Sequence, residues 1–502
     1  MKFIRIKKEN INMYLLLVIM GCIYVFPVLW SGRYYKDDLA RTLYGVTGWK
    51  GDGRPVGEWL IVALTGFQNQ IDDIAPLSWL LAILILAYGL TIYAQNCLTD
   101  IGRKAVGVIP LLFVITNPFA IENWSYRYDC IIMFTAVSIV FLLYALPKES
   151  YAVYALVNFA ASVVIMSVYQ AAIGMCIVLA VTDIFLCLER HQKVKKAIIY
   201  NSISMLMIGA GAIVYKLTIA RYCIDRLGWQ NQASELVQGT FRETLCTVYS
   251  NIKSAFDFIF MVWSAFSPVY LIVYAILIVC AWGIVVHICY QYGSAGHKLL
   301  RSVLGAVLPL VAFGGTFLPL VLLNSLQWDS KKFLSFGGFG FFVAVVLLTT
   351  LKKAKWRKAC LTALCICLFQ QYTYMNIYGN TLKNQREYDE YLVHSIVYDL
   401  DTISSNGDES ILSFDGEAPR SRVVTRMCGK YPHFEKLVPL YFTNDTWMGG
   451  AYVYRYVQDN IHIESITEEE LAQIKEMSPV IEHTTYSCYK TGNKIIIKFM
   501  NS

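Results

Sequence analysis

The sequence predicts an α-helical membrane protein with about eleven spans, interfacial helices in the first outer loop, and a small C-terminal α/β domain. Of its 502 residues, 56% are hydrophobic and 16% are charged, whereas soluble domains carry about 25% charged residues. The apolar residues gather in runs of about 17–25, the length that crosses a hydrocarbon core of roughly 30 Å. The chain becomes polar beyond residue 375. We therefore expect a transmembrane domain over residues 1–375 and a second domain over residues 376–502.

The apolar runs predict the individual spans. The first run follows a basic N-terminus and has no small-residue cleavage site behind it, so we predict a membrane anchor and not a removed signal. The eleven predicted spans are residues 11–30, 76–97, 106–120, 130–146, 151–167, 171–187, 198–220, 268–287, 299–323, 333–351 and 359–373.

Short clusters of Lys and Arg predict the orientation of these spans. All five clusters fall on one side when the chain crosses the membrane eleven times, and the positive-inside rule assigns that side to the cytoplasm. The clusters are residues 2–8, 103–104, 190–196, 298–301 and 352–358. We therefore expect a cytoplasmic N-terminus, a C-terminal domain outside the cytoplasm, and four outer loops. These loops are residues 31–74, 122–129, 221–267 and 324–332.

Local patterns also predict the elements of the C-terminal domain. Residues 381–403 place apolar side chains on one face of a helix. Thr467 and Glu470 have the spacing of a capping box, which predicts that a second helix starts there. Residues 486–489 and 494–499 flank a short turn and predict a terminal hairpin.

Two cysteines could pair, and the missing motifs and the source of the net charge count against nucleotide-binding, zinc-dependent and nucleic-acid-binding proteins. Cys428 and Cys488 share the C-terminal domain and could form a disulfide if that domain is extracytoplasmic. The sequence contains no P-loop, no dinucleotide-binding fingerprint and no HExxH zinc motif. The net charge of +7 comes mostly from loops that set orientation, so it does not indicate binding to nucleic acid.

The first outer loop, residues 31–74, carries two adjacent carboxylates, Asp37 and Asp38, with Arg41 one turn further on. Capping a helix needs only one Asp, so the second carboxylate favours a function. One carboxylate could remove a proton from an attacking hydroxyl as a general base, and Asp38 is slightly preferred for this role. Its partner could orient it, or both could share a divalent cation such as Mg²⁺ or Mn²⁺.

Gly53-Arg54-Pro55 is a second motif of the same loop. It could form a simple turn. An Arg among flexible residues is equally suited to an anion, because the planar donors of a guanidinium match the oxygens of a phosphate.

The third outer patch mixes aromatic rings with charged side chains. Aromatic residues are common at membrane interfaces, but this patch also contains carboxylates, and sugar rings pack against such faces and hydrogen-bond to such groups. The candidates for sugar or acceptor binding here are Glu122, Trp124, Tyr126 and Asp129. Weaker candidates are Tyr169, Gln170, Lys331 and Lys332, although lysines near the ends of spans also snorkel toward water.

The order of these short motifs resembles that of the serotype-converting type II glucosyltransferase family. The likeness covers nearly the whole chain, and the shared order of the motifs supplies most of its specificity. The motifs are residues 35–41, 53–55, 117–119, 122–129 and 167–170, and the segment from Gln371-Tyr372 to Tyr388-Asp389.

This resemblance implies a glycosyltransferase similar to the GT-C enzymes, placed in the inner membrane of a bacterium. Such enzymes take a glucosyl or related hexosyl residue from a polyprenyl-phosphate carrier and add it to a surface polysaccharide. By resemblance, Asp37 or Asp38 would be the loop carboxylate that acts as base or metal ligand. Arg41, Arg54 or Arg127 would then meet the donor phosphate.

The chain departs from the family pattern at one place, and two other classes of protein compete with the enzyme. Ser330-Lys331-Lys332-Phe333 stands where an arginine-bearing pattern is expected, so a lysine there would hold phosphate less rigidly. A transporter or flippase of lipid-linked sugars would use the same spans but would place polar groups near the bilayer centre. A scaffold for envelope assembly would tolerate the loss of Asp37 and Asp38.

Overall fold

The chain folds into two compact units. The computed structural model describes residues 4–68, 70–99, 101, 105–224, 235–292, 298–324, 326–404, 409–457 and 461–500. Unit 1 comprises Met1–Phe26, Thr47–Asn69 and Ile74–Asn376, and unit 2 comprises Pro27–Val46, Gln70–Asp73 and Ile377–Ser502. The first outer loop is therefore divided between the two units. The assignment of residues 1–375 and 376–502 to separate domains stays a prediction.

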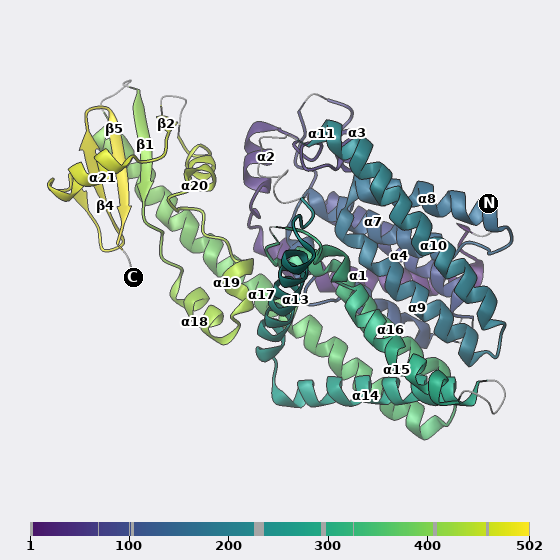
Figure 1. The fold of residues 1–502 in the computed structure, drawn as a ribbon. Coiled ribbons are helices and arrows are strands. Elements are labelled where there is room, and N and C mark those ends of the chain that lie inside the picture. Colours follow the sequence, from purple (N-terminus) through teal and green to yellow (C-terminus); the bar gives the residue numbers. More distant parts are fainter. Residues whose placement is uncertain are drawn as a thin grey trace. The chain divides into compact units, whose positions relative to one another are not determined.

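Unit 1 is built from helices, coloured purple to green in Figure 1, and two of them, α1 and α17, continue into unit 2 from Pro27 and Ile377. Helix α4 packs against α7, α8 against α10, and α14 against α15. Helix α16 is apolar and buried on all sides, as expected for a helix in the middle of a bundle. The elements are η2 (Lys8–Asn10), α1 (Ile11–Ser31), α3 (Pro55–Leu64), α4 (Leu77–Cys97), η3 (Ala105–Gly107), α5 (Val108–Ile115), α6 (Ile121–Ser125), α7 (Asp129–Tyr144), α8 (Tyr151–Val168), η4 (Gln170–Ile173), α9 (Gly174–Glu189), α10 (Val194–Tyr215), η5 (Lys216–Ala220), α11 (Arg221–Cys223), α13 (Phe241–Ser264), α14 (Pro268–Gln291), α15 (Lys298–Gly315), η6 (Leu318–Leu320), η7 (Ser330–Phe336), α16 (Gly337–Thr350) and α17 (Ala354–Ile403).

Eight helical segments within the described part of the chain are long and apolar enough to cross a membrane. This finding confirms the coarse prediction of a multi-pass membrane protein that is largely helical. The segments are Lys8–Ser31, Leu77–Cys97, Tyr151–Val168, Gln170–Glu189, Val194–Cys223, Pro268–Gln291, Lys298–Gly315 and Ser330–Thr350.

The other three predicted spans take different forms, so the count of eleven and the orientation stay predictions. Helix α5 has only 8 residues, because the chain breaks before Pro118, which disfavours helical backbone in the residue that precedes it. Helix α7 has 16 residues, and residues 359–373 lie within α17, which is 50 residues long. The basic pair at residues 103–104 lies outside the described residues.

Unit 2 contains a five-stranded mixed sheet in the order β2-β1-β5-β4-β3. Strand β1 pairs in parallel with β2 and β5, whereas β4 pairs antiparallel with β5 and β3. The strands are β1 (Ser410–Asp415), β2 (Ile461–Ile463), β3 (Ile481–Glu482), β4 (Tyr486–Thr491) and β5 (Lys494–Phe499). The accompanying helices are α2 (Asp38–Tyr44), α18 (Arg422–Lys430), α19 (His433–Leu437), α20 (Thr446–Val453) and α21 (Glu468–Lys475).

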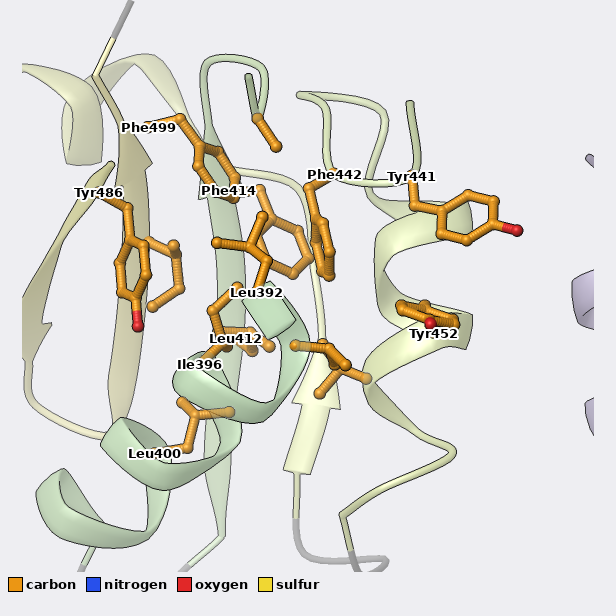
Figure 2. Close-up of a cluster of buried hydrophobic side chains, with 14 of the residues drawn as sticks. Leu392, Ile396, Leu400, Leu412, Phe414, Tyr441, Phe442, Tyr452, Tyr486 and Phe499 are labelled. Carbon is orange, nitrogen blue, oxygen red and sulfur yellow. The ribbon is translucent and has the colours of Figure 1, made fainter. Parts of the chain in front are cut away.

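The core of unit 2 lies between this sheet and the C-terminal part of α17. Leu392, Ile396 and Leu400 face the aromatic side chains of Phe414 and Phe499 (Figure 2). This contact confirms the predicted apolar face of the helix over residues 381–403. The sequence pattern fits the arrangement, because positions three and four apart share one face of a helix.

Two further local predictions for unit 2 are confirmed. Strands β4 and β5 form the predicted hairpin, and Thr467 and Glu470 cap α21 reciprocally. Cys428 and Cys488 are both buried free thiols.

Candidate functional site

Segments of unit 1 that lie far apart in the sequence meet in one polar cluster. They are the turn before α3, the stretch from α6 to the first residue of α7, the residue between α8 and η4, and the start of η7. We call this group the unit 1 cluster and define it as Arg54, Glu122, Tyr126, Asp129, Tyr169 and Lys331. All six residues were predicted site residues.

The turn that carries Arg54 depends on its neighbours. Pro55 occupies the first position of α3, where its missing N–H has no intrahelical partner to lose. Gly53 has a φ of +75°, and a Cβ there would lie 2.4 Å from the Tyr215 hydroxyl, so the turn requires Gly. The Gly53 carbonyl accepts hydrogen bonds from the Tyr215 hydroxyl at 2.5 Å and from Gln170 Nε2 at 3.4 Å. Gln170 therefore supports the turn that carries Arg54.

Arg54 and Asp129 form the charged centre of the cluster. Arg54 Nη1 lies 3.5 Å from Asp129 Oδ1, and the side chains are 18% and 5% exposed. Asp129 begins α7, where a carboxylate is favoured by the helix dipole, and its Oδ1 also accepts from Trp49 Nε1 at 2.9 Å. The guanidinium lies over the Tyr169 ring, 4.9 Å from its centroid, a cation–π geometry. Arg54 is held from two sides.

Lys331 connects the other members of the cluster. Its backbone N–H donates to Glu122 Oε2 at 2.9 Å, and its Nζ donates to the Tyr126 hydroxyl at 3.1 Å. Its carbonyl accepts from the Tyr169 hydroxyl at 2.9 Å and from Asn123 Nδ2 at 3.4 Å. Lys331, which stands where an arginine-bearing pattern is expected, therefore belongs to the same cluster as Arg54.

The electrostatics of the cluster keep Arg54 positively charged. Burial lowers the pKa of Arg54, but Tyr169, Asp52 and Asp129 raise it, and the pKa lies above its ordinary value. Within the described residues, the buried Nε of Arg54 has no hydrogen-bond partner. A buried donor without a partner costs about 1–3 kcal/mol, so this position favours an anion.

Sequence reasoning missed three residues that shape the cluster. Asn123 lies inside the patch at residues 122–129, and Trp49 lies shortly before the motif at residues 53–55. Their closeness to predicted site residues was the signal that could have identified them. Tyr215 had no signal, because it ends an apolar span and belongs to no motif.

Three predicted residues of unit 1 have other surroundings. Trp124 is fully buried, stacks on Phe134 with ring centroids 3.6 Å apart, and donates to the Ile115 carbonyl. Arg127 is partly exposed in the turn before α7. Lys332 lies 3.4 Å from Asp329 and donates to the Gln327 carbonyl. Their proposed roles in binding stay predictions.

Asp37, Asp38 and Arg41 belong to unit 2. Asp37 precedes α2, but its side chain makes no capping hydrogen bond. It is 49% exposed and lies 3.5 Å from Arg41 Nη1. Asp38 is fully buried. Of the two carboxylates, only Asp37 is open to solvent.

A divalent cation at Asp37 and Asp38 stays a prediction. Within the described ranges, no group of three His, Cys, Asp or Glu side chains is arranged to hold a metal ion. The pair supplies carboxylate oxygens, which suit Mg²⁺. An ion there would need further ligands from water or substrate, because Asp38 is buried.

The eight candidate spans and the partly buried Arg54 of unit 1 define a multi-pass membrane protein with a polar cluster that suits an anion. The chain belongs to the family described as Glucosyl transferase GtrII, whose profile matches residues 26–348. This confirms the family resemblance and makes the protein a membrane glucosyltransferase. All members of the unit 1 cluster lie within the matched region.

Comparisons with individual proteins agree with this membership. The chain is 25% identical over 440 residues to the protein described as "Uncharacterized 55.3 kDa protein in gtrB 5'region" of Salmonella phage P22, and the match covers 86% of each chain. No solved structure matches the chain.

Proposed function

We propose that the protein moves a glucosyl or related hexosyl residue from a polyprenyl-phosphate carrier to a surface polysaccharide outside the bacterial inner membrane. The observation that carries this proposal is the partly buried, fixed guanidinium of Arg54 in a chain of the glucosyltransferase family. A sugar on a lipid phosphate presents one anionic group close to the membrane. Binding this phosphate requires a side chain with a positive charge in a fixed position.

Arg54 is the proposed ligand of the donor phosphate, and Lys331, which is linked to it through Tyr169, is a second proposed cation. When the glycosidic bond to phosphate breaks, negative charge grows on the leaving oxygen. A preorganised cation stabilises that charge without reorganising during the reaction. Tyr169 and Asp129 hold the guanidinium in place. Arg127 is proposed as a further cation for this phosphate, and the phosphate-binding role of Arg41, which belongs to unit 2, stays a separate prediction.

Asp37 and Asp38 are the proposed carboxylates for the acceptor hydroxyl. A general base removes the proton as the oxygen attacks the anomeric carbon. The exposure of Asp37 favours it for direct contact with the hydroxyl, whereas buried Asp38 is suited to orienting it. This reverses the slight preference for Asp38 that the sequence suggested.

Purified protein provides the direct test of the proposed function. The protein is mixed with polyprenyl-phosphate glucose and polysaccharide from a strain that lacks the gene, and the polysaccharide is analysed by mass spectrometry. We expect the polysaccharide to gain a hexose at one fixed linkage. Movement of the lipid-linked sugar across vesicles without any added hexose would instead identify a transporter.

A further inference from the structure

Unit 2 has a pocket that none of the proposed roles uses. It is an open pocket of about 440 Å³ and is lined by Tyr391, His394, Ser395, Tyr398, Asp399 and His483. We call it the α17 pocket, because five of these six residues lie on α17. Leu392, Ile396 and Leu400 occupy the core-facing side of the same helix (Figure 2).

Two exposed aromatic rings dominate the α17 pocket. The side chains of Tyr391 and Tyr398 are 64% and 73% exposed. They are seven residues apart, which is about two helical turns and about 10.5 Å along the axis. Each tyrosine offers an apolar ring face and a polar hydroxyl. Two such rings at this spacing suit the faces of two linked sugar residues.

A buried carboxylate orients the polar wall of the pocket. Asp399 is 3% exposed, and its Oδ2 lies 2.8 Å from His483 Nε2 and accepts from the Tyr486 hydroxyl at 2.6 Å. His483 is thereby fixed with its other ring nitrogen, Nδ1, without a partner among the described residues. A fixed imidazole nitrogen beside aromatic rings is a directional partner for a sugar hydroxyl.

The charge of the lining selects among possible ligands. Among the described residues, none that lines the α17 pocket is Lys or Arg. A phosphate or an anionic lipid headgroup would find no cation there, and the one carboxylate is already engaged by His483 and Tyr486. The lining therefore favours a neutral, hydroxyl-rich ligand.

We infer that the α17 pocket binds two adjacent neutral sugar residues of the acceptor polysaccharide. This inference rests on the proposed function for the identity of the ligand. Tyr391 and Tyr398 each pack under one ring, and His483 and Ser395 contact hydroxyl groups. Binding there raises the concentration of the acceptor at the enzyme but contributes no chemical step.

The test uses full-length protein in detergent and a neutral oligosaccharide released from the surface polysaccharide of the host strain. The variant Tyr391→Ala/Tyr398→Ala should raise the Kd for this oligosaccharide at least tenfold in saturation-transfer NMR. Tyr391→Phe/Tyr398→Phe keeps both rings and should bind within threefold of the parent. Trp447→Ala, which removes an exposed aromatic residue outside the pocket, is the matched control. An unchanged Kd in the double Ala variant would overturn the inference.

Kinetics separate this inference from the proposed function. If both hold, the double Ala variant raises the KM for acceptor and leaves kcat and the KM for donor within twofold. If the parent transfers hexose but the double Ala variant binds and reacts as the parent does, only the pocket assignment fails. If the parent transfers no hexose but loses oligosaccharide binding on double substitution, only the proposed function fails. Loss of binding to phosphatidylglycerol vesicles in the double Ala variant would overturn the sugar assignment in favour of a lipid surface.

Discussion

At the scale of single residues, the partly buried guanidinium of Arg54 is held by Asp129 and Tyr169. Its Nε has no hydrogen-bond partner among the described residues. Arg54→Ala should lower kcat by about 10²–10³, the usual cost of removing one preorganised donor. The kcat of Arg54→Lys should lie between those of the parent and of Arg54→Ala, because an ammonium keeps the charge but loses the planar fork of donors. Rates are measured with polyprenyl-phosphate glucose and purified protein.

The control for Arg54 is Lys50→Ala, which removes an exposed cation from the same loop. It should leave the rate within twofold. Thermal unfolding of each variant shows whether lost activity reflects lost folding. Parent-like donor KM and kcat in Arg54→Ala would refute the phosphate assignment.

The two carboxylates of α2 give a second prediction at this scale. Asp37→Asn should reduce transfer by about 10²–10⁴, the usual contribution of a general base. Asp38→Asn should reduce transfer less, because this buried side chain orients its neighbour. Asn keeps the size of Asp and its ability to cap a helix, so a structural role would tolerate either change.

Asp72→Asn is the matched control for the carboxylates, because Asp72 is an exposed carboxylate of the same outer loop. Assays with and without a chelator show whether activity depends on a divalent cation. If Asp37→Asn and Asp38→Asn both retain parental turnover, neither residue is the base.

At the scale of elements, a buried ion pair fixes the first part of the first outer loop, up to Val46, within unit 2. Arg33 Nη2 lies 2.7 Å from Asp389 Oδ2, with side chains 1% and 3% exposed, and also donates to the Pro439 carbonyl. Burial raises the pKa of Asp389, and Arg33 opposes that rise. Arg33→Ala would leave this carboxylate buried without its charged partner, which typically costs about 3–5 kcal/mol.

We therefore expect Arg33→Ala to lower the Tm of the full-length protein by several degrees. Lys383→Ala breaks an exposed ion pair with Glu387 in the same unit and should change the Tm little, because exposed pairs contribute about 0–1 kcal/mol. The measurement is thermal unfolding in detergent. Equal Tm values for the two variants would contradict the structural role of Arg33.

Elements with a local pattern could be predicted from the sequence, whereas their long-range partners could not. The capping box of Thr467 and the β4–β5 hairpin depend on residues close in the chain, and both were predicted correctly. The pairing of Arg33 with Asp389 spans 356 positions and left no signal. In the same way, the sequence predicted Arg54, Tyr169 and Lys331 as separate candidates, but only folding brings them together.

Apolar runs predict that a helix is present better than they predict its length. Residues 106–120 are apolar throughout most of their length, yet α5 ends at Ile115. Asn117 Nδ2 donates to the carbonyls of Phe333 and Leu334, and Pro118 disfavours continued helix. A hydropathy pattern contains no information about such tertiary hydrogen bonds.

At the scale of the whole molecule, the proposed orientation can be tested by cysteine labelling in intact cells. The exposed native cysteines Cys246, Cys280 and Cys365 are first replaced by Ser. A cysteine at Glu469, exposed on α21, should react with a membrane-impermeant maleimide. A cysteine at Lys195, in a predicted cytoplasmic cluster, should react only after permeabilisation. The reverse pattern would overturn the orientation and place the proposed chemistry on the wrong side of the membrane.

The division of the first outer loop has a consequence for engineering new specificities. Leu39 is fully buried in the same core as Leu412 and Phe414, so the segment Pro27–Val46 is an integral part of the folded C-terminal unit. A chimera that grafts only residues 377–502 from a relative would mismatch this core. A viable exchange must transfer residues 27–46 and 377–502 together. The carboxylates at positions 37 and 38 would then come from the same relative as the C-terminal residues.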